Sequence, residues 1–262
     1  MTEFAWPPLR PAKLVWPAPG WVPPTKSQPT SPPWTVSLWK DLTRPGDGHR
    51  RVARDKGRGE AAVKLLHATG VDAFPVPLDV TSDVSVAEAA VLIERQSGRL
   101  DVLVNNAGIS GEMGPGWVQD PTTLDLDVVR KVVDTNVYGV IRVTNAMLPL
   151  LRRASSPPIV NISSSVGSVT WQADPNIEVG PIMAAYSPTK SYLNAVTVHY
   201  ARQFAGTDIL INAACPGLVA TDFTGYQGRP AQEAAATPIR LAALPDGGPT
   251  GSFFNDDGVI PW

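Results

Sequence analysis

Candidate strands and helices alternate along this chain from about residue 50 to its last residue. Apolar runs predict strands at residues 100–104, 159–162, 209–215 and 251–254. Helical patterns lie before and between these runs, at residues 85–95, 126–153, 191–204 and 231–243. Such alternation is typical of a parallel sheet with helices on both faces. We therefore expect an α/β fold, a doubly wound parallel sheet in a single domain.

One further apolar run, at residues 74–78, predicts a strand although it contains Pro75 and Pro77. Two prolines at this spacing remove N–H groups from the same side of a strand. A sheet tolerates that loss only at its edge, so we expect this strand to be an edge strand.

The composition excludes several classes of protein. A chain of 262 residues with 43% hydrophobic residues can bury a core, and a net charge of −2 gives no electrostatic reason to expect nucleic acid. The histidines are scattered without metal-ligand spacing. The single cysteine, Cys215, lies in an apolar run and is expected to be a buried small side chain. Because no run reaches membrane-spanning length and no signal core is present, we expect a cytoplasmic protein without a membrane partner.

Tyr186 and Lys190 form the most informative pair in the chain. They are four positions apart, just before the helical pattern at residues 191–204, so a helix would bring their heads to one face. Pro188 fits only in the first turn of that helix. A cation lowers the pKa of a neighbouring phenol, and a phenol near neutral pH can exchange a proton with a carbonyl or an alcohol. The alternative is a chance spacing on a solvated helix.

Turn-forming polar segments follow the predicted strands. They are residues 105–108, 161–167 and 216–221, together with Asp79 after the run at 74–78. In an open parallel α/β sheet, ligands bind at the carboxyl ends of the strands. The sequence therefore predicts one site built from these segments.

Together with Tyr186 and Lys190, these segments resemble the short-chain dehydrogenase/reductase family over roughly residues 54–262. The resemblance implies a Rossmann-like fold and hydride transfer between a nicotinamide dinucleotide and a carbonyl or alcohol. Ser164 and Tyr186 are 22 residues apart, and the extra stretch between them, Thr170 to Met183, resembles an insertion of carbonyl-reductase-like members, which forms part of the substrate pocket and can disfavour tetramers. A monomer or dimer is therefore expected. Within the insertion, Trp171 either faces the substrate or packs as a structural aromatic.

The resemblance also implies a catalytic set, namely Ser164, Tyr186, Lys190 and Asn136. Tyr186 would donate and accept the proton, while Lys190 would lower its pKa and bind the nicotinamide ribose. Ser164 would polarise the carbonyl. Asn136 would hold a water relay toward the lysine, although an asparagine in a helix usually faces solvent. The flanking serines, Ser163 and Ser165, are expected to bond to backbone groups instead.

A cofactor site for NADP, in preference to NAD, follows from the same resemblance. Its residues are Arg54, Asp79, Val80, Asn106, Ala107, Gly108, Tyr186, Lys190, Pro216, Gly217, Val219 and Thr221. The forked donors of Arg54 suit the 2′-phosphate, with a lone surface arginine as the alternative. Asp79 would accept a hydrogen bond from the adenine amine, or would only cap the next helix. For Asn105, a role in joining strands is nearly as well supported as a cofactor contact.

The first 35 residues depart from the family pattern. Eleven prolines lie up to Pro45, and dense prolines break helix and sheet, so we expect a poorly ordered segment 1–35 before a domain at 36–262. The family phosphate loop, Thr-Gly-x-x-x-Gly-x-Gly, belongs here, but no glycines have that spacing. A shifted reading frame, a wrong start or true degeneration would each explain this. A disordered extension is favoured over a proline-rich docking tail.

Two functions are carried forward. The first is an oxidoreductase that transfers a hydride between NADP(H) and a small carbonyl or alcohol. The alternative is an impaired or non-enzymatic family member unable to bind dinucleotide tightly.

Without a first strand, the strand at residues 100–104 is also expected to lack a central neighbour.

Overall fold

The computed structural model of the chain describes residues 35–37, 60–61, 63–64, 67–68 and 73–262. In this part of the chain, six strands form one sheet in the order β1-β2-β3-β4-β5-β6. They are β1 (Thr35–Ser37), β2 (Val102–Asn105), β3 (Pro158–Ile162), β4 (Leu210–Ala214), β5 (Phe253–Asn255) and β6 (Gly258–Val259). Neighbouring strands are parallel from β1 to β5, and β6 pairs antiparallel with β5. The expected α/β fold with a largely parallel sheet is confirmed.

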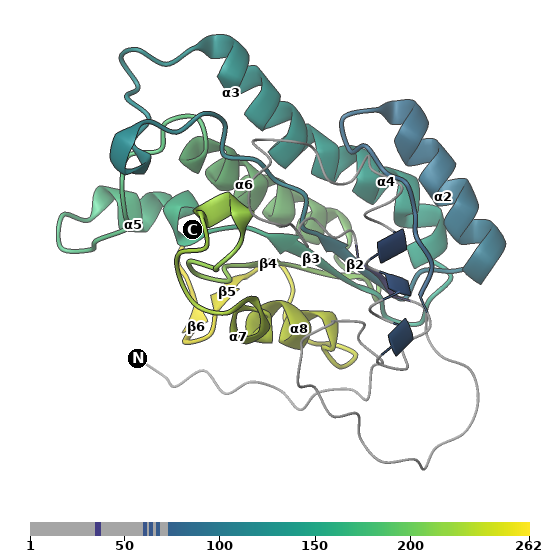
Figure 1. Cartoon of the computed structure of the whole chain (residues 1–262). Coiled ribbons are helices and arrows are strands. Elements are labelled where there is room, and N and C mark those ends of the chain that lie inside the picture. Colours follow the sequence, from purple (N-terminus) through teal and green to yellow (C-terminus); the bar gives the residue numbers. More distant parts are fainter. Residues whose placement is uncertain (1–34, 38–59, 62, 65–66, 69–72) are drawn as a thin grey trace.

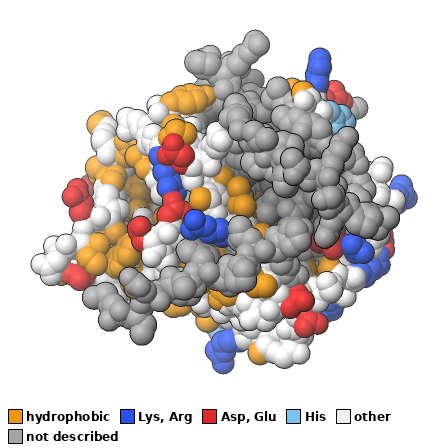
Figure 2. All heavy atoms as spheres, turned by 90° about the horizontal axis from the view of Figure 1, so that it is seen from below, with side chains coloured by type: hydrophobic (Ala, Val, Ile, Leu, Met, Phe, Trp, Pro, Cys, Tyr) orange, Lys and Arg blue, Asp and Glu red, His pale blue; other side chains and the backbone are white. Residues whose placement is uncertain are grey.

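Helices cover both faces of this sheet, with α2, α4 and α6 on one side and α7 and α8 on the other (Figure 1). The helices are α2 (Asp83–Ser97), α3 (Leu126–Val133), α4 (Gly139–Leu151), α5 (Val169–Ala173), α6 (Ser187–Gln203), α7 (Ala231–Ala234) and α8 (Ala236–Ala242). A π-helical turn, η3 (Asp134–Tyr138), joins α3 to α4, and short 3-10 turns lie at η2 (Pro115–Trp117), η4 (Ser165–Gly167) and η5 (Asp222–Thr224). None of the described helices is long and apolar enough to span a bilayer. On the face below the sheet, acidic and basic side chains are interspersed over the described surface (Figure 2).

Consecutive residues of the central strands point into two different apolar cores. Leu103, Ile159 and Ile211 pack with residues of α2, α4 and α6. The residues that precede or follow them, such as Val102 and Val160, pack with α8 on the other face. Because helices bury both faces, these strands consist of continuous apolar runs, which is why the sequence revealed them.

Two expectations about one edge of the sheet are wrong. Within the described part of the chain, residues 74–78 do not pair with any strand. The physical reason is that Pro75 and Pro77 have no N–H to donate to a neighbouring strand. The second strand does not lack a neighbour, because β1 pairs with β2 in parallel, with Thr35 opposite Val102. Residues 1–34, to which most of the proline-rich segment belongs, lie outside the described residues.

Candidate active site

The carboxyl ends of β2 and β3 meet the start of α6 at Lys190. Its Nζ donates a hydrogen bond to the carbonyl of Ile162, the last residue of β3, at 2.8 Å. A Cβ at Gly108, in the segment after β2, would lie 3.7 Å from the same Nζ. The predicted segments after β2 and β3 therefore converge at the carboxyl edge, where ligands bind in parallel α/β sheets.

Tyr186 immediately precedes α6, and Pro188 occupies the first turn of that helix, as the sequence predicted. The Lys190 Nζ lies 5.5 Å from the centre of the Tyr186 ring, and both side chains are buried. Phe223, from the segment after β4, packs against the same ring with a centroid distance of 5.4 Å. The helix thus brings the phenol and the ammonium to one face, as their four-residue spacing indicated.

The protonation of this pair differs from the sequence-based expectation. Burial raises the pKa of the Tyr186 phenol above its usual value, and nearby Cys215 raises it further, whereas a hydrogen bond with the Ser164 side chain lowers it. Burial also lowers the pKa of the Lys190 ammonium to about 8, with Cys215 opposing that shift. The net shift of the Tyr186 pKa is therefore upward, opposite in direction to the one expected from a neighbouring cation. Loss of hydration disfavours the phenolate more than its surroundings stabilise it.

Gly167 allows the turn that carries Ser164 to approach α6. A Cβ at Gly167 would lie 2.7 Å from the Lys190 Cβ and 2.8 Å from the Lys190 carbonyl carbon, which is closer than carbon atoms pack. The Gly167 N–H donates to the Ser164 carbonyl at 2.8 Å. This close approach places the Ser164 hydroxyl within hydrogen-bonding reach of Tyr186.

The flanking serines make other contacts. The Ser163 hydroxyl donates to Asn194 Oδ1 at 2.6 Å, so the expectation of a backbone partner is wrong for this side chain. Asn194 in turn donates to the Gly167 carbonyl at 3.1 Å, which ties the same turn to α6. The backbone N–H of Ser165 donates to the Cys215 Sγ at 3.1 Å. Cys215 is buried, as its apolar run predicted.

Asn136 lies in the π-helical turn η3 and is completely buried, so it does not face solvent. Its Oδ1 accepts from the Ile109 N–H at 2.8 Å, and its Nδ2 donates to the Ile109 carbonyl at 2.8 Å and to Thr189 Oγ1 at 3.0 Å. Thr189 Oγ1 then donates to the Tyr186 carbonyl at 2.7 Å. Asn136 therefore connects the segment after β2 to the first turn of α6. Single π-helical turns inside helices are frequent at functional sites.

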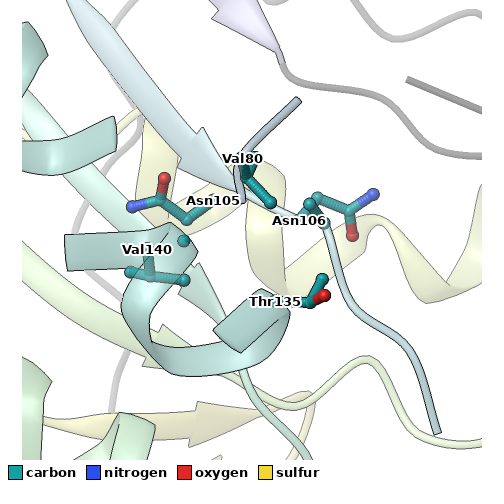
Figure 3. Close-up of a pocket in the computed structure, with 7 residues that line it drawn as sticks. Val80, Asn105, Asn106, Thr135 and Val140 are labelled. Atoms are coloured by element: carbon teal, nitrogen blue, oxygen red, sulfur yellow. The ribbon is translucent and has the colours of Figure 1, made fainter. Parts of the chain in front are cut away.

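A small pocket beside the carboxyl end of β2 brings together three of the predicted cofactor residues, Val80, Asn106 and Ala107 (Figure 3). Its other lining residues are Asn105, Thr135, Gly139 and Val140. A Cβ at Gly139 would lie 2.8 Å from the Val80 Cγ2, so a glycine lets α4 approach Val80. The Asn105 amide is used structurally, because its Nδ2 donates to Asn161 Oδ1 at 2.9 Å and to Thr144 Oγ1 at 3.1 Å. It joins β2 to β3 and α4.

Asp79 shapes the turn that presents Val80 to this pocket. Its Oδ1 accepts from the Thr81 N–H at 3.1 Å and from the Thr81 hydroxyl at 2.7 Å. The N-cap of α2 is Ser82, whose Oγ accepts from the Ser85 N–H at 3.2 Å. The alternative that Asp79 only caps the next helix is therefore wrong.

The loop after β4 carries Pro216, Gly217, Val219 and Thr221, and a residue that sequence analysis missed anchors it. Arg229 donates to the Pro216 carbonyl from Nε at 3.0 Å and from Nη2 at 2.7 Å, and forms an ion pair with Asp256. Burial raises the pKa of Asp256, but its bonds to Arg229 and Thr237 hold it below its usual value. Gly217 has a φ of 72°, which favours glycine. Nothing periodic in the sequence links Arg229 to Pro216.

Two further sequence predictions concern Trp171 and Arg54. Trp171 packs against the apolar cluster that contains Cys215 and Phe253, which supports its interpretation as a structural aromatic. Arg54 lies outside the described residues, so its contact with a 2′-phosphate stays a prediction.

The carboxyl edge of this parallel α/β sheet holds the half-buried Ser164 together with the buried Tyr186, Lys190 and Asn136. This is the edge at which Rossmann-like folds bind their ligands. The sequence matches the short chain dehydrogenase family over residues 38–232. The protein belongs to this family, whose members bind nicotinamide dinucleotides.

Individual relatives agree with this assignment. The chain is 34% identical to short-chain dehydrogenase/reductase 1 of Saponaria officinalis, over 80% of this chain and 86% of that protein. It is 31% identical to carbonyl reductase (NADPH) 1 of Rattus norvegicus, over 80% of this chain and 87% of that protein. Among solved structures, NADPH-bound carbonyl reductase from chicken fatty liver is similar, with a TM-score of 0.66 and 25% identity over 78% of this chain and 83% of that chain.

Proposed function

We propose that the protein interconverts small carbonyl compounds and alcohols with NADP(H), and that Tyr186 donates and accepts the proton. The observation that carries this proposal is the grouping of three side chains. Tyr186 is hydrogen-bonded to Ser164, and the Lys190 ammonium lies 5.5 Å from the Tyr186 ring. The names of two similar proteins, both NADPH carbonyl reductases, support the substrate class and the cofactor.

The described residues fit a nicotinamide dinucleotide along the carboxyl edge of the sheet. The pocket at Val80, Asn106 and Ala107 offers a partly apolar recess for the adenosine end. An ammonium has three donors, and Lys190 uses one on the Ile162 carbonyl, so it can also hold ribose hydroxyls. The backbone of Pro216 and its neighbours in the loop after β4 can bind the carboxamide. Binding at these three places would align the nicotinamide with Tyr186.

When bound, NADPH supplies the hydride that reduces the carbonyl carbon. The Ser164 hydroxyl donates a hydrogen bond to the substrate oxygen, and Tyr186 transfers its phenolic proton to that oxygen as the alcohol forms. Because burial raises its pKa, the phenol holds this proton at neutral pH, as reduction requires. The Lys190 ammonium stabilises the phenolate that remains. Oxidation of an alcohol needs the Tyr186 phenol to be deprotonated first, so a higher pH favours the oxidation.

The preference for NADP over NAD rests on the sequence. The Arg54 guanidinium would bind the 2′-phosphate, which its forked donors suit. The similar proteins whose names include NADPH support this choice. A cytoplasmic location and a monomeric or dimeric state are proposals from the sequence as well.

Tyr186→Phe tests the proposed reaction. General acid–base groups contribute about 10²–10⁴-fold, so we expect kcat for a carbonyl substrate to fall by that factor while the circular dichroism spectrum is unchanged. Tyr200→Phe is the matched control, since it removes a hydroxyl from the far part of the same helix, where it donates to Asn145 Oδ1 at 2.7 Å. A Tyr186→Phe variant within about threefold of the parent would contradict the role of the phenol.

The rival function is a family member that has lost tight dinucleotide binding. One observation favours it, because residues 1–50 lack the spacing Thr-Gly-x-x-x-Gly-x-Gly. Thermal unfolding with and without NADPH separates the two, since a ligand at a hundred times its Kd adds about 2.7 kcal/mol to the free energy of unfolding. An unchanged midpoint at millimolar NADPH would favour the rival.

A further inference from the structure

Gln119 is a buried amide that connects separate segments next to the site. It lies between η2 and α3, in the stretch that follows β2, and only 4% of its surface is exposed. Its Nε2 donates to the carbonyls of Ser110 and Glu112, each at 2.9 Å. Its Oε1 accepts from the N–H of Ala185 at 3.0 Å. Ala185 is the residue immediately before Tyr186.

The backbone of Gln119 continues the same connection. Its N–H donates to the Ile182 carbonyl at 2.8 Å, and its carbonyl accepts from the Ala184 N–H at 3.4 Å. Gln119 and Met183 thereby form an isolated parallel bridge. Side chain and backbone together hold residues 182–185 against the segment after β2.

This attachment has a counterpart on the other side of Tyr186. Asn136 holds Ile109, in the segment after β2, and also donates to Thr189 at 3.0 Å. Gln119 holds the same segment to Ala185, one residue before the phenol. Two buried amides therefore fix the chain on both sides of Tyr186 to one loop. A displacement of residues 182–185 would move Tyr186 relative to Ser164.

We propose that Gln119 is a positioning residue for Tyr186. The chemistry of the contacts requires an amide, because the side chain donates twice to carbonyls and accepts once from an N–H. A carboxylate of the same shape would face two carbonyl oxygens without a proton to share, and an alkyl group would remove the partner of three backbone groups, of which the Ala185 N–H belongs to a buried residue. The effect on turnover rests on the proposed function, whereas the effect on local order does not.

Gln119→Leu tests the proposal, with Asn212→Leu as the matched control. Asn212 is also a buried amide, which donates to the Pro249 carbonyl at 2.7 Å and accepts from the Ser252 N–H at 3.1 Å. These partners precede β5, at the amino side of the sheet and away from Tyr186. Both variants lose hydrogen bonds of a buried amide, so both are expected to lose stability. Only Gln119→Leu is expected to displace Tyr186, so an effect found in that variant alone reflects the position of Tyr186.

Hydrogen–deuterium exchange of the whole protein provides the first measurement. In Gln119→Leu we expect backbone amides of residues 182–187 to exchange about tenfold faster or more, with no such change in Asn212→Leu. Equal exchange of these residues in the two variants would overturn the proposal. If Gln119→Leu does not fold, Gln119→Glu provides the same measurement, because it keeps the size of the side chain and loses both donations.

Steady-state kinetics provide the second measurement. A misplacement of about 1 Å can cost about 100-fold in rate, so we expect kcat of Gln119→Leu to fall about 10- to 100-fold with the KM for NADPH within twofold of the parent. A loss confined to KM, or an unchanged kcat despite faster exchange, would overturn the positioning role. If the parent itself reduces no carbonyl, the proposed function fails, and the exchange measurement still decides whether Gln119 holds residues 182–187 in place.

Discussion

Replacing Gly167 with alanine tests how closely the serine turn must approach α6. The new Cβ would lie 2.7 Å from the Lys190 Cβ and 2.8 Å from the Lys190 carbonyl carbon. Non-bonded carbons pack at about 3.5–4.0 Å, so the turn and the helix must separate by about 1 Å. Overpacking of this kind costs about 1–3 kcal/mol. For a domain of this size, that corresponds to a fall in Tm of roughly 2–12 °C.

The larger effect of Gly167→Ala is expected on turnover. Gly167 donates its N–H to the Ser164 carbonyl at 2.8 Å, so the displacement moves Ser164 as well. Ser164 is the residue whose hydroxyl bonds to Tyr186. Because a misplacement of about 1 Å can cost about 100-fold, we expect kcat to fall about 10- to 100-fold.

The assay compares kcat for NADPH-dependent carbonyl reduction with Tm from circular dichroism. Gly98→Ala is the control, since Gly98 ends α2 with a φ of 70° and its added Cβ would have nothing within 4 Å. A side chain in that left-handed conformation costs about 1–2 kcal/mol, so stability falls comparably without a change near the site. The reasoning is refuted if Gly167→Ala keeps kcat within twofold of the parent, or if Gly98→Ala loses as much activity.

Three other perturbations have defined outcomes. Without cofactor, the free energy of unfolding should rise between about pH 8 and pH 10. The pKa of Lys190 is about 8 in the folded protein and near its usual 10.5 in the unfolded chain. In that pH range the unfolded chain therefore binds one proton more than the folded protein, so a rise in pH favours the folded protein. Urea unfolding should show this rise in the parent and not in Lys190→Met. Arg54→Ala should reduce the preference for NADPH over NADH in binding titrations. If the parent binds NADPH and NADH with equal affinity, and the variant does the same, then Arg54 does not bind the 2′-phosphate. Deleting residues 1–34 should shift Tm by less than about 2 °C, whereas deletion through residue 37 removes the neighbour of β2 and should lower Tm clearly.

Local patterns account for the parts of the site that could be predicted. The spacing of Tyr186 and Lys190 implies a shared helix face whatever the rest of the fold does, because a helix repeats every 3.6 residues. The polar turns after the apolar runs were located for a similar reason, since strand ends are visible in the sequence. The pKa of Tyr186 could not be predicted in this way, because burial is the largest cause of its shift and burial depends on the packing of distant segments.

The sequence alone determined the parallel α/β architecture and indicated that the candidate residues lie at the carboxyl edge of the sheet. Continuous apolar runs and helical periodicity are local signals, and parallel topology follows from their alternation. Only the tertiary structure decided that β1 is the neighbour of β2, that Arg229 anchors Pro216 and that Gln119 reaches Ala185. These contacts join residues far apart in the chain, and their partners are backbone groups, which every residue carries. No pattern of side chains could therefore identify them before the chain was folded.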